Sequence, residues 1–72
     1  MNNFILHINL VICNQLGKKV RTLINETKSS GVYTIIWDGK NDVGQEVSSG
    51  LYFCLLKIKN FPWLRKKMLL LK

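Results

Sequence analysis

The side chains with the clearest chemical potential are four oxygen donors grouped in one polar stretch. They are Asp38, Asn41, Asp42 and Glu46. Carboxylate and amide oxygens are the ligands that Ca²⁺ prefers. However, Lys40 stands two positions after Asp38, where a calcium loop of the EF-hand type carries another oxygen donor. Asp and Asn more often cap backbone groups in turns, so we predict no metal site here.

Catalytic chemistry has little support elsewhere in the chain. His7 is the single histidine, and no recognisable motif places a serine, a cysteine or a carboxylate beside it. No glycine-rich loop of the type that binds phosphates or dinucleotides is present. We therefore predict a protein that is not an enzyme, with no catalytic residues and no cofactor.

The two cysteines, Cys13 and Cys54, are too few for a zinc site, and their spacing fits no metal motif. Each lies within an apolar, strand-like pattern, where a cysteine behaves as a small hydrophobic residue. A disulfide requires that the two strands be neighbours, which the sequence does not establish. We favour two free, packed thiols.

The elements that would position these residues are strands. Ile8, Leu10 and Ile12 share one apolar parity, and residues 14–17 supply turn chemistry before a return strand over residues 18–24, with a bulge at Leu23. Residues 25–31 form a polar connection, and residues 32–37 alternate as the best strand, with Trp37 facing the core.

A turn-rich loop over residues 38–50 precedes another alternating strand, in which Tyr52, Cys54 and Leu56 share a face. Residues 60–62 then make a turn around Pro62, and residues 64–71 form the last strand. Strands at this spacing, without helical periodicity, predict an all-β fold. We expect a small antiparallel β-sandwich of about five strands, forming one domain over residues 1–72.

The chain is strongly basic, with a formal net charge of +7 from 11 Lys and Arg against 4 Asp and Glu. Such a balance suits nucleic acid or another polyanion. The cations are scattered, however, and lysines at alternate strand positions usually form a solvated face or protect an edge strand. We favour that interpretation and predict no nucleic-acid partner.

The first residues are apolar enough to be compared with a signal peptide. Residues 1–3 lack a basic side chain, His7 and Asn9 interrupt the apolar run, and no small-residue cleavage site follows. The run is too short to span a bilayer. We predict a strand here, no convincing signal peptide and no membrane span.

A combination of spaced motifs resembles a known bacterial family over residues 8–72. The upstream part is the hairpin of residues 8–23, with Gly17 in its turn, and the terminal part is the run over residues 67–72. The motif includes Gly17 and a set of residues between these two parts. The complete set is Gly17, Trp37, Asp38, Gly39, Asn41, Asp42, Gly44, Gly50 and Tyr52. They are similar to those of flagellar hook-capping-protein-like immunoglobulin domains and type IX secretion C-terminal sorting domains.

The resemblance implies that the fold is a small antiparallel immunoglobulin-like β-sandwich. It also implies a non-catalytic C-terminal module of a larger secreted or cell-surface protein. Family members carry an earlier strand than this chain does, so we expect an N-terminally truncated copy or a fragment. The implied role is a sorting signal read by protein partners in a type IX secretion system, carried by the last strand. Its residues are Arg65, Lys66, Lys67, Met68, Leu69, Leu70, Leu71 and Lys72.

Two other function classes stay open at this point. The first is a structural module that packs against other protein domains and has no export role. The second is a basic protein that binds anions. Its candidate residues are Lys18, Lys19, Lys57, Lys59, Arg65, Lys66 and Lys67.

Overall fold

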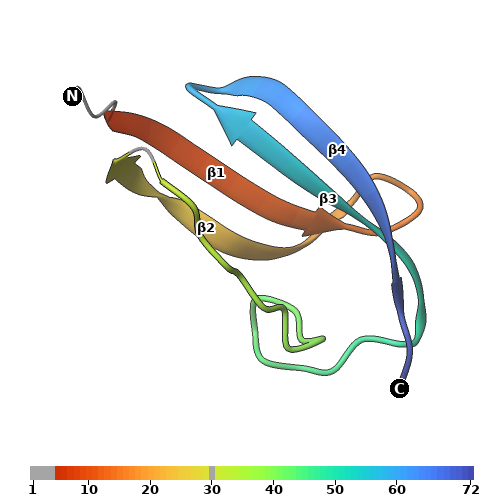
Figure 1. Ribbon diagram of the computed structural model, residues 1–72. Coiled ribbons are helices and arrows are strands. Elements are labelled where there is room, and N and C mark those ends of the chain that lie inside the picture. The colour runs from red at the N-terminus through yellow and green to blue at the C-terminus, as the bar shows by residue number, and fades with distance from the viewer. Residues whose placement is uncertain (1–4, 30) are drawn as a thin grey trace.

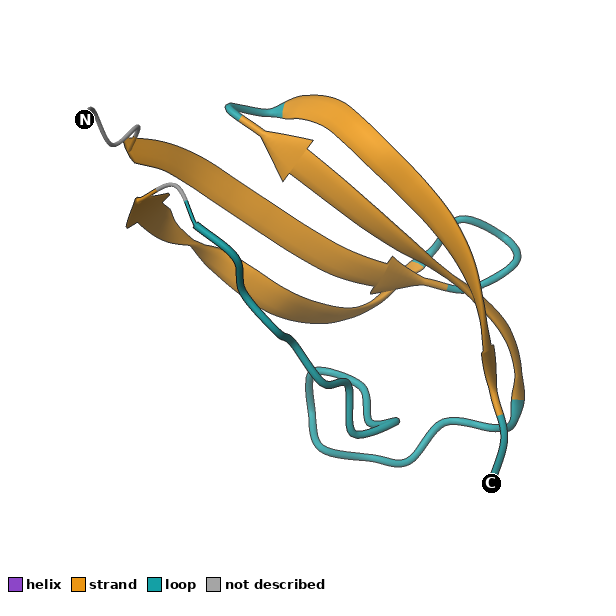
Figure 2. Cartoon of the chain, in the orientation of Figure 1, coloured by secondary structure: helices purple, strands orange, loops and turns teal. Residues whose placement is uncertain are grey.

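A computed structural model describes residues 5–29 and 31–72 of the chain. Four strands form one antiparallel sheet: β1 (Ile5–Cys13), β2 (Lys19–Ser29), β3 (Gly50–Ile58) and β4 (Phe61–Leu70). Their order in the sheet is β2-β1-β3-β4, so β1 and β3 are central and β2 and β4 are the edges (Figure 1). The described residues contain no helix (Figure 2). The all-β antiparallel fold class is confirmed.

Two tight turns connect the hairpins. In the first, the backbone N–H of Asn14 donates to the carbonyl of Lys18 at 2.9 Å, and Gly17 has a φ of +80°, which a side chain rarely allows. The predicted turn over residues 14–17 is confirmed. In the second, Lys59 and Asn60 have φ of +52° and +67°, as a two-residue hairpin turn requires.

The β4 strand begins earlier than the sequence predicted. The turn lies at residues 59–60 instead of 60–62, so Pro62 belongs to β4 and faces Lys57 across the ladder. Proline is tolerated there because β4 is an edge strand and the pairing is irregular between Leu56 and Lys57. The β2 strand is also longer than predicted. Its residues 25–29 pair with β1 as far as Ile5, although they are polar.

The predicted bulge in β2 is confirmed. Leu10 pairs with Ile24 and Val11 with Thr22, which leaves Leu23 as the extra residue on β2. A bulge adds local twist to a strand pair, and the ribbon shows a twisted sheet (Figure 1). Between β1 and β3 the pairing is regular, with Ile12 facing Cys54 and Cys13 facing Phe53. Side chains of even number on β1 and β3 therefore share one face, which we call the even face, and the others form the odd face.

The strand predicted over residues 32–37 does not form. This segment carries no ladder and crosses the sheet as an extended coil, so there are four strands and one open sheet where the sequence predicted about five and two layers (Figure 2). The topology supplies the reason. Both β2 and β3 run antiparallel to β1, so the connection between them must cross over, and here it passes over the even face without a neighbouring strand to accept its hydrogen bonds.

The alternation of the crossover segment is nevertheless expressed in its packing. Tyr33 and Ile35 line a cavity together with Ile8, Leu10 and Ile24 of the sheet. Val32 and Ile36, of the opposite parity, are 99% and 85% exposed. The side chains therefore keep a period of two although the backbone is unpaired. The buried residues at the centre of the sheet are Val11, Ile12, Ile24 and Tyr52.

Candidate functional site

The predicted sorting residues lie on β4 and directly after it. Lys66 faces Cys54, Lys67 faces Phe53 and Met68 faces Tyr52 across the β3–β4 ladder. Arg65, Lys66 and Lys67 are exposed, and Leu71 and Lys72 continue past the strand end. Because β4 is an edge strand, it pairs with β3 on one side only. The structure thus places a basic and then apolar segment along one edge of the sheet.

The two faces of β4 differ in their surroundings. Lys66, Met68 and Leu70 share the even face, and a side chain at Gly39 would lie 3.6 Å from a Leu70 methyl, so the loop touches this end of the strand. On the odd face the Arg65 guanidinium lies over the Phe53 ring at 4.3 Å from its centroid. This cation–π contact holds a cation against an apolar surface.

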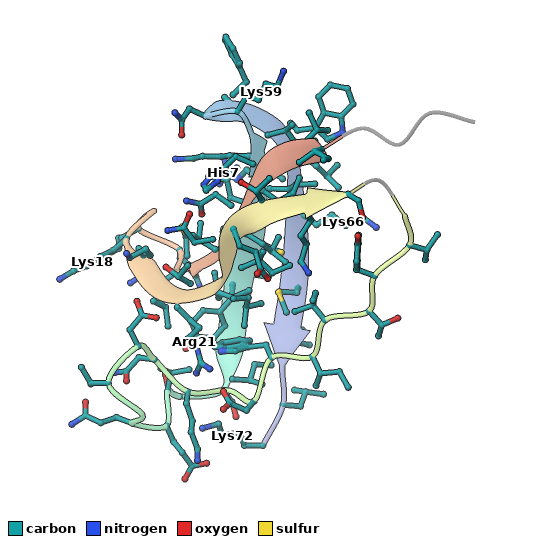
Figure 3. The ribbon with its side chains drawn as sticks, turned by 90° about the vertical axis from the view of Figure 1, so that its left-hand side faces the viewer. His7, Lys18, Arg21, Lys59, Lys66 and Lys72 are labelled. Carbon is teal, nitrogen blue, oxygen red and sulfur yellow. The ribbon has the colours of Figure 1, made fainter. Side chains whose placement is uncertain are left out.

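The end of the chain is fastened to the loop. The backbone N–H of Lys72 donates to Ser49 Oγ at 3.0 Å, and Lys72 Nζ lies 3.4 Å from Glu46 Oε1. Figure 3 shows Lys72 and Arg21 at the same end of the sheet, beside the loop that leads into β3. These contacts place the last residues of β4 next to the family-motif residues of the loop.

The loop itself is a small hairpin over residues 39–47. The backbone N–H of Val47 donates to the Gly39 carbonyl at 3.0 Å, and that of Asn41 donates to the Gln45 carbonyl at 2.9 Å. Asn41 Oδ1 accepts from the N–H groups of Val43 and Gln45, at 3.1 and 2.9 Å. An Asx side chain that accepts from its own turn stabilises the turn locally.

Two carboxylates fasten this hairpin to β2. Asp38 Oδ1 accepts from Arg21 Nη1 at 3.1 Å, and Asp42 Oδ1 accepts from the backbone N–H of Thr22 at 2.9 Å. Both side chains were among the four oxygen donors considered as calcium ligands. Their oxygens take part in hydrogen bonds to the protein, and residues 5–29 and 31–72 contain no group of three or more His, Cys, Asp or Glu side chains that could hold a metal ion.

Sequence reasoning missed the role of Arg21. It appeared only as one of the scattered cations, yet its guanidinium also donates to the Lys40 carbonyl at 3.1 Å. Lys19, which was one of the anion-binding candidates, also approaches the loop, with its Nζ 4.0 Å from Asp42 Oδ2. No local signal could have found this anchor, because Arg21 and Asp38 are 17 residues apart and meet only through the crossover.

Replacing Asp42 tests the attachment of the loop to β2. We expect Asp42→Ala to lower the free energy of unfolding by about 1 kcal/mol, because the Thr22 N–H loses a charged acceptor at a half-exposed site. Asp42→Asn keeps the oxygen and should cost less. Urea denaturation followed by circular dichroism measures both. Equal losses for the two variants would show that the charge, and not the hydrogen bond, holds the loop.

Tyr52 and Trp37 connect the loop to the core. Their rings pack edge to face with centroids 5.1 Å apart, and Trp37 Nε1 donates to the Lys40 carbonyl at 2.9 Å. Tyr52 is buried near the start of β3, and its hydroxyl donates to the Ser48 carbonyl at 2.7 Å. A strand-start tyrosine bonded to the backbone a few residues upstream is a recurring feature of immunoglobulin-like folds.

Removing this hydroxyl should have a measurable cost. We expect Tyr52→Phe to lower the free energy of unfolding by about 1 kcal/mol, because the Ser48 carbonyl loses its partner at a part-buried site. Tyr33→Phe is the matched comparison, since the Tyr33 hydroxyl bonds the Ser29 carbonyl at an exposed site. Thermal melts of both variants would contradict the prediction if the exposed tyrosine cost more.

The cysteines lie on adjacent strands but on opposite faces. Cys54 faces Ile12, while Cys13 is the next residue along β1 and belongs to the odd face. Both are free, in agreement with the expectation of two free thiols. Burial, and secondly the nearby Cys13, raise the pKa of the Cys54 thiol above its ordinary value.

This raised pKa predicts slow alkylation of Cys54. The thiolate is the reactive form, and a raised pKa lowers its fraction at pH 8. We expect iodoacetamide to modify Cys54 more slowly in the folded chain than in the chain unfolded by urea, as followed by mass spectrometry of a Cys13→Ser variant. Equal rates in the two states would contradict the burial of this thiol.

The remaining chemical candidate, His7, lies at the far end of the sheet from the loop. Its ring Nε2 is 2.8 Å from Asn25 Oδ1 on the neighbouring strand, an exposed cross-strand contact (Figure 3). The described residues contain no helix long and apolar enough to cross a membrane. Residues 1–3, considered above in relation to a signal peptide, lie outside the described residues.

The comparison with family models decides the relationship. The model of the FlgD Ig-like domain matches residues 2–57, which is most of the chain. This chain belongs to the FlgD Ig-like domain family. Comparison with curated proteins and with solved structures found no match. The recognition made from the motifs is confirmed, and the family is one of non-catalytic modules.

The range matched by the FlgD Ig-like domain model ends near the end of β3. It includes β1, β2, the crossover with its motif loop, and β3 almost to its end at Ile58. The β4 strand lies outside the range, although the motif resemblance extended to residue 72. The family assignment therefore rests on the three-strand part and the loop, and the role of β4 has to be argued from its own residues.

Proposed function

We propose that this FlgD Ig-like domain is a non-catalytic sorting module that directs export across the outer membrane and surface attachment by a type IX secretion system. The observation that carries the proposal is the position of β4. The segment that the sequence predicts as the signal, residues 65–72, lies on an edge strand with exposed cations and an unpaired side. A terminal strand of this kind suits recognition by strand addition.

Contacts with the loop hold the end of β4 in place. The loop fastens the end of β4 through Ser49 and Glu46, and the hairpin below it is fastened to β2 through Asp38 and Asp42. A partner would therefore meet an ordered edge, which lowers the entropy lost on binding. The protein carrying the module would be secreted or held at the cell surface.

An export assay tests the proposal. Residues 1–72 are fused to the C-terminus of a reporter that has its own signal peptide, and the fusion is expressed in a type IX-competent cell. We expect the reporter at the cell surface or in the medium, and we expect the fusion lacking residues 65–72 to stay inside. A complete fusion that remains in the periplasm would overturn the sorting role.

Because the truncated module could fail to fold, a second variant is needed. Lys66→Ser combined with Lys67→Ser removes exposed charges and leaves the ladder with β3 in place. We expect this fusion to be exported less efficiently while its thermal melt stays close to the parent's. Unchanged export would exclude these two lysines from the signal.

A structural module that packs against a neighbouring domain, without export, is the second candidate. The odd face favours it, because a groove of about 520 Å³ there is lined mainly by apolar side chains, among them Phe53, Leu55 and Trp63. Exposed apolar surface of this kind commonly marks protein contacts. Retention of the complete fusion in the export assay, with a folded module, is the outcome that would favour this role.

A further inference from the structure

The two edge strands, β2 and β4, differ in the hydrogen bonds made to their outer sides. On β2, the loop takes up outward-facing groups: the N–H of Asp42 donates to the Val20 carbonyl at 3.1 Å, and the N–H of Thr22 donates to Asp42 Oδ1. On β4, the described part of the chain provides no hydrogen bond to the outer side of the strand. The loop therefore covers part of the β2 edge, at Val20 and Thr22, whereas the β4 edge, within the described residues, is open to a further strand along its whole length.

The two edges of the sheet also differ in how their charges are paired. Each of the four carboxylate side chains has a cationic partner in β2 or at the end of the chain. The pairs are Glu26–Lys28, Asp38–Arg21, Asp42–Lys19 and Glu46–Lys72. The segment from Gly50 to Leu70 contains no Asp or Glu at all, and its cations have no ion-pair partner among the described residues. They are Lys57, Lys59, Arg65, Lys66 and Lys67.

The order of residues along β4 narrows the class of partner. The strand reads apolar over residues 61–64, basic over 65–67 and apolar again over 68–71. At its first apolar block Trp63 is 71% exposed and lines the groove on the odd face with Pro62. Side chains of adjacent strands meet in pairs, and opposite charges across a ladder are favourable. A strand that matches β4 therefore has an acidic centre between apolar ends.

We propose that the open edge of β4 binds an extended segment of a partner protein in which consecutive acidic residues lie between apolar ones, and that this segment adds to the sheet as its next strand. The inference rests on the proposed function, because it names the chemistry of the partner that reads the sorting strand. The partner's backbone completes the ladder, its carboxylates face Arg65, Lys66 and Lys67, and an apolar side chain enters the groove beside Trp63.

The same charges argue against a second copy of this chain as the occupant. Antiparallel pairing of two β4 strands would bring three cations of one copy against three of the other. Like charges across a ladder destabilise the pairing. Nucleic acid would pair with the cations, but it would neither form a backbone ladder with the β4 edge nor contact the apolar residues on either side of the cations. An acidic strand between apolar ends would use the cations, the backbone groups and the apolar residues.

The test is a binding titration with a defined probe. A fluorescently labelled ten-residue peptide, with three consecutive glutamates between valine- and threonine-rich ends, is titrated with the full chain at physiological ionic strength and followed by anisotropy. We expect saturable binding. Lys66→Glu combined with Lys67→Glu should weaken the affinity about tenfold or more. Lys18→Glu combined with Lys40→Glu changes the net charge equally, outside the β3–β4 hairpin, and should weaken it less than threefold.

Two further probes separate strand addition from charge alone. A peptide of the same sequence with N-methylated central amides keeps its carboxylates and loses its ladder donors, so we expect its binding to be lost. An oligonucleotide of similar charge should compete weakly. Equal binding of the methylated peptide, equal loss in both charge variants, or stronger binding of the oligonucleotide would each overturn the proposal. Peptide binding without export of the fusion would leave this inference standing and overturn the sorting role. Export without peptide binding would leave the sorting role standing and overturn this inference.

Discussion

Trp37→Ala should lower the free energy of unfolding by about 3 kcal/mol, toward the lower end of the range for truncating a large aromatic side chain. Trp37 is half-buried, which is why the lower end applies. Its ring packs against Tyr52, and its Nε1–H donates to the Lys40 carbonyl. The truncation removes apolar burial, an aromatic pair and a hydrogen bond together. Small domains have only about 5–15 kcal/mol of stability in total, so the loss is large.

The chain contains its own control for this substitution. Trp63 is the only other tryptophan and is 71% exposed on β4, so Trp63→Ala should cost less than about 1 kcal/mol. Both variants are compared with the parent by urea denaturation, followed by far-ultraviolet circular dichroism because the fluorescence signal changes with the tryptophan content. A Trp37→Ala loss as small as that of Trp63→Ala would show that the loop is not packed on Tyr52.

The sequence predicted which side chains share a face more reliably than which backbones pair. The parity of Ile8, Leu10 and Ile12 and that of Tyr52, Cys54 and Leu56 both appear in the sheet, on the even face. Apolar alternation reports what a segment buries, and burial follows from side-chain chemistry alone. These four strands are therefore largely recoverable from the sequence, with errors at their ends.

Residues 32–37 show where that reasoning stops. Tyr33 and Ile35 turn toward the sheet and Val32 and Ile36 away from it, as the alternation predicts. Whether such a segment is a strand depends on a neighbour that can accept its hydrogen bonds, and the neighbour is decided by the order of strands in the sheet. Strand order is a long-range property. The alternation was correct, and the second sheet inferred from it was not formed.

In the candidate site, too, the local features could be predicted from the sequence and the long-range contacts could not. The geometry of the loop could be anticipated from its Asp, Asn and Gly residues, because Asn41 accepts from N–H groups only two and four residues away. The fastening of Asp38 and Asp42 to β2 could not, because it depends on the crossover that brings residues 38–42 beside Arg21 and Thr22. The open edge of β4 likewise follows from topology. The sequence predicted the basic segment, and only the fold shows that it lies on an edge.

Ile12→Ala should be the most damaging single truncation of the sheet. Ile12 has no exposed surface and lies in the central strand β1, between Arg21 of β2 and Cys54 of β3. Removal of a buried isoleucine side chain costs about 2–5 kcal/mol, and the cost is higher where the site cannot collapse. Strands on both sides hold the backbone here, so we expect about 4 kcal/mol, comparable with the whole stability of a domain of this size. The cooperative thermal transition should be lost or fall by tens of degrees.

Two further isoleucine variants make this result specific. Ile12→Val removes one methyl group and should cost only about 1 kcal/mol. Ile36→Ala makes the same chemical change on the outward parity of the crossover, where the side chain is 85% exposed, and should change the free energy of unfolding by less than about 0.5 kcal/mol. Urea denaturation of the three variants gives the order Ile12→Ala, Ile12→Val, Ile36→Ala. A large cost at Ile36 would mean that the outward parity of the crossover is covered in solution, as it would be if a second layer formed there.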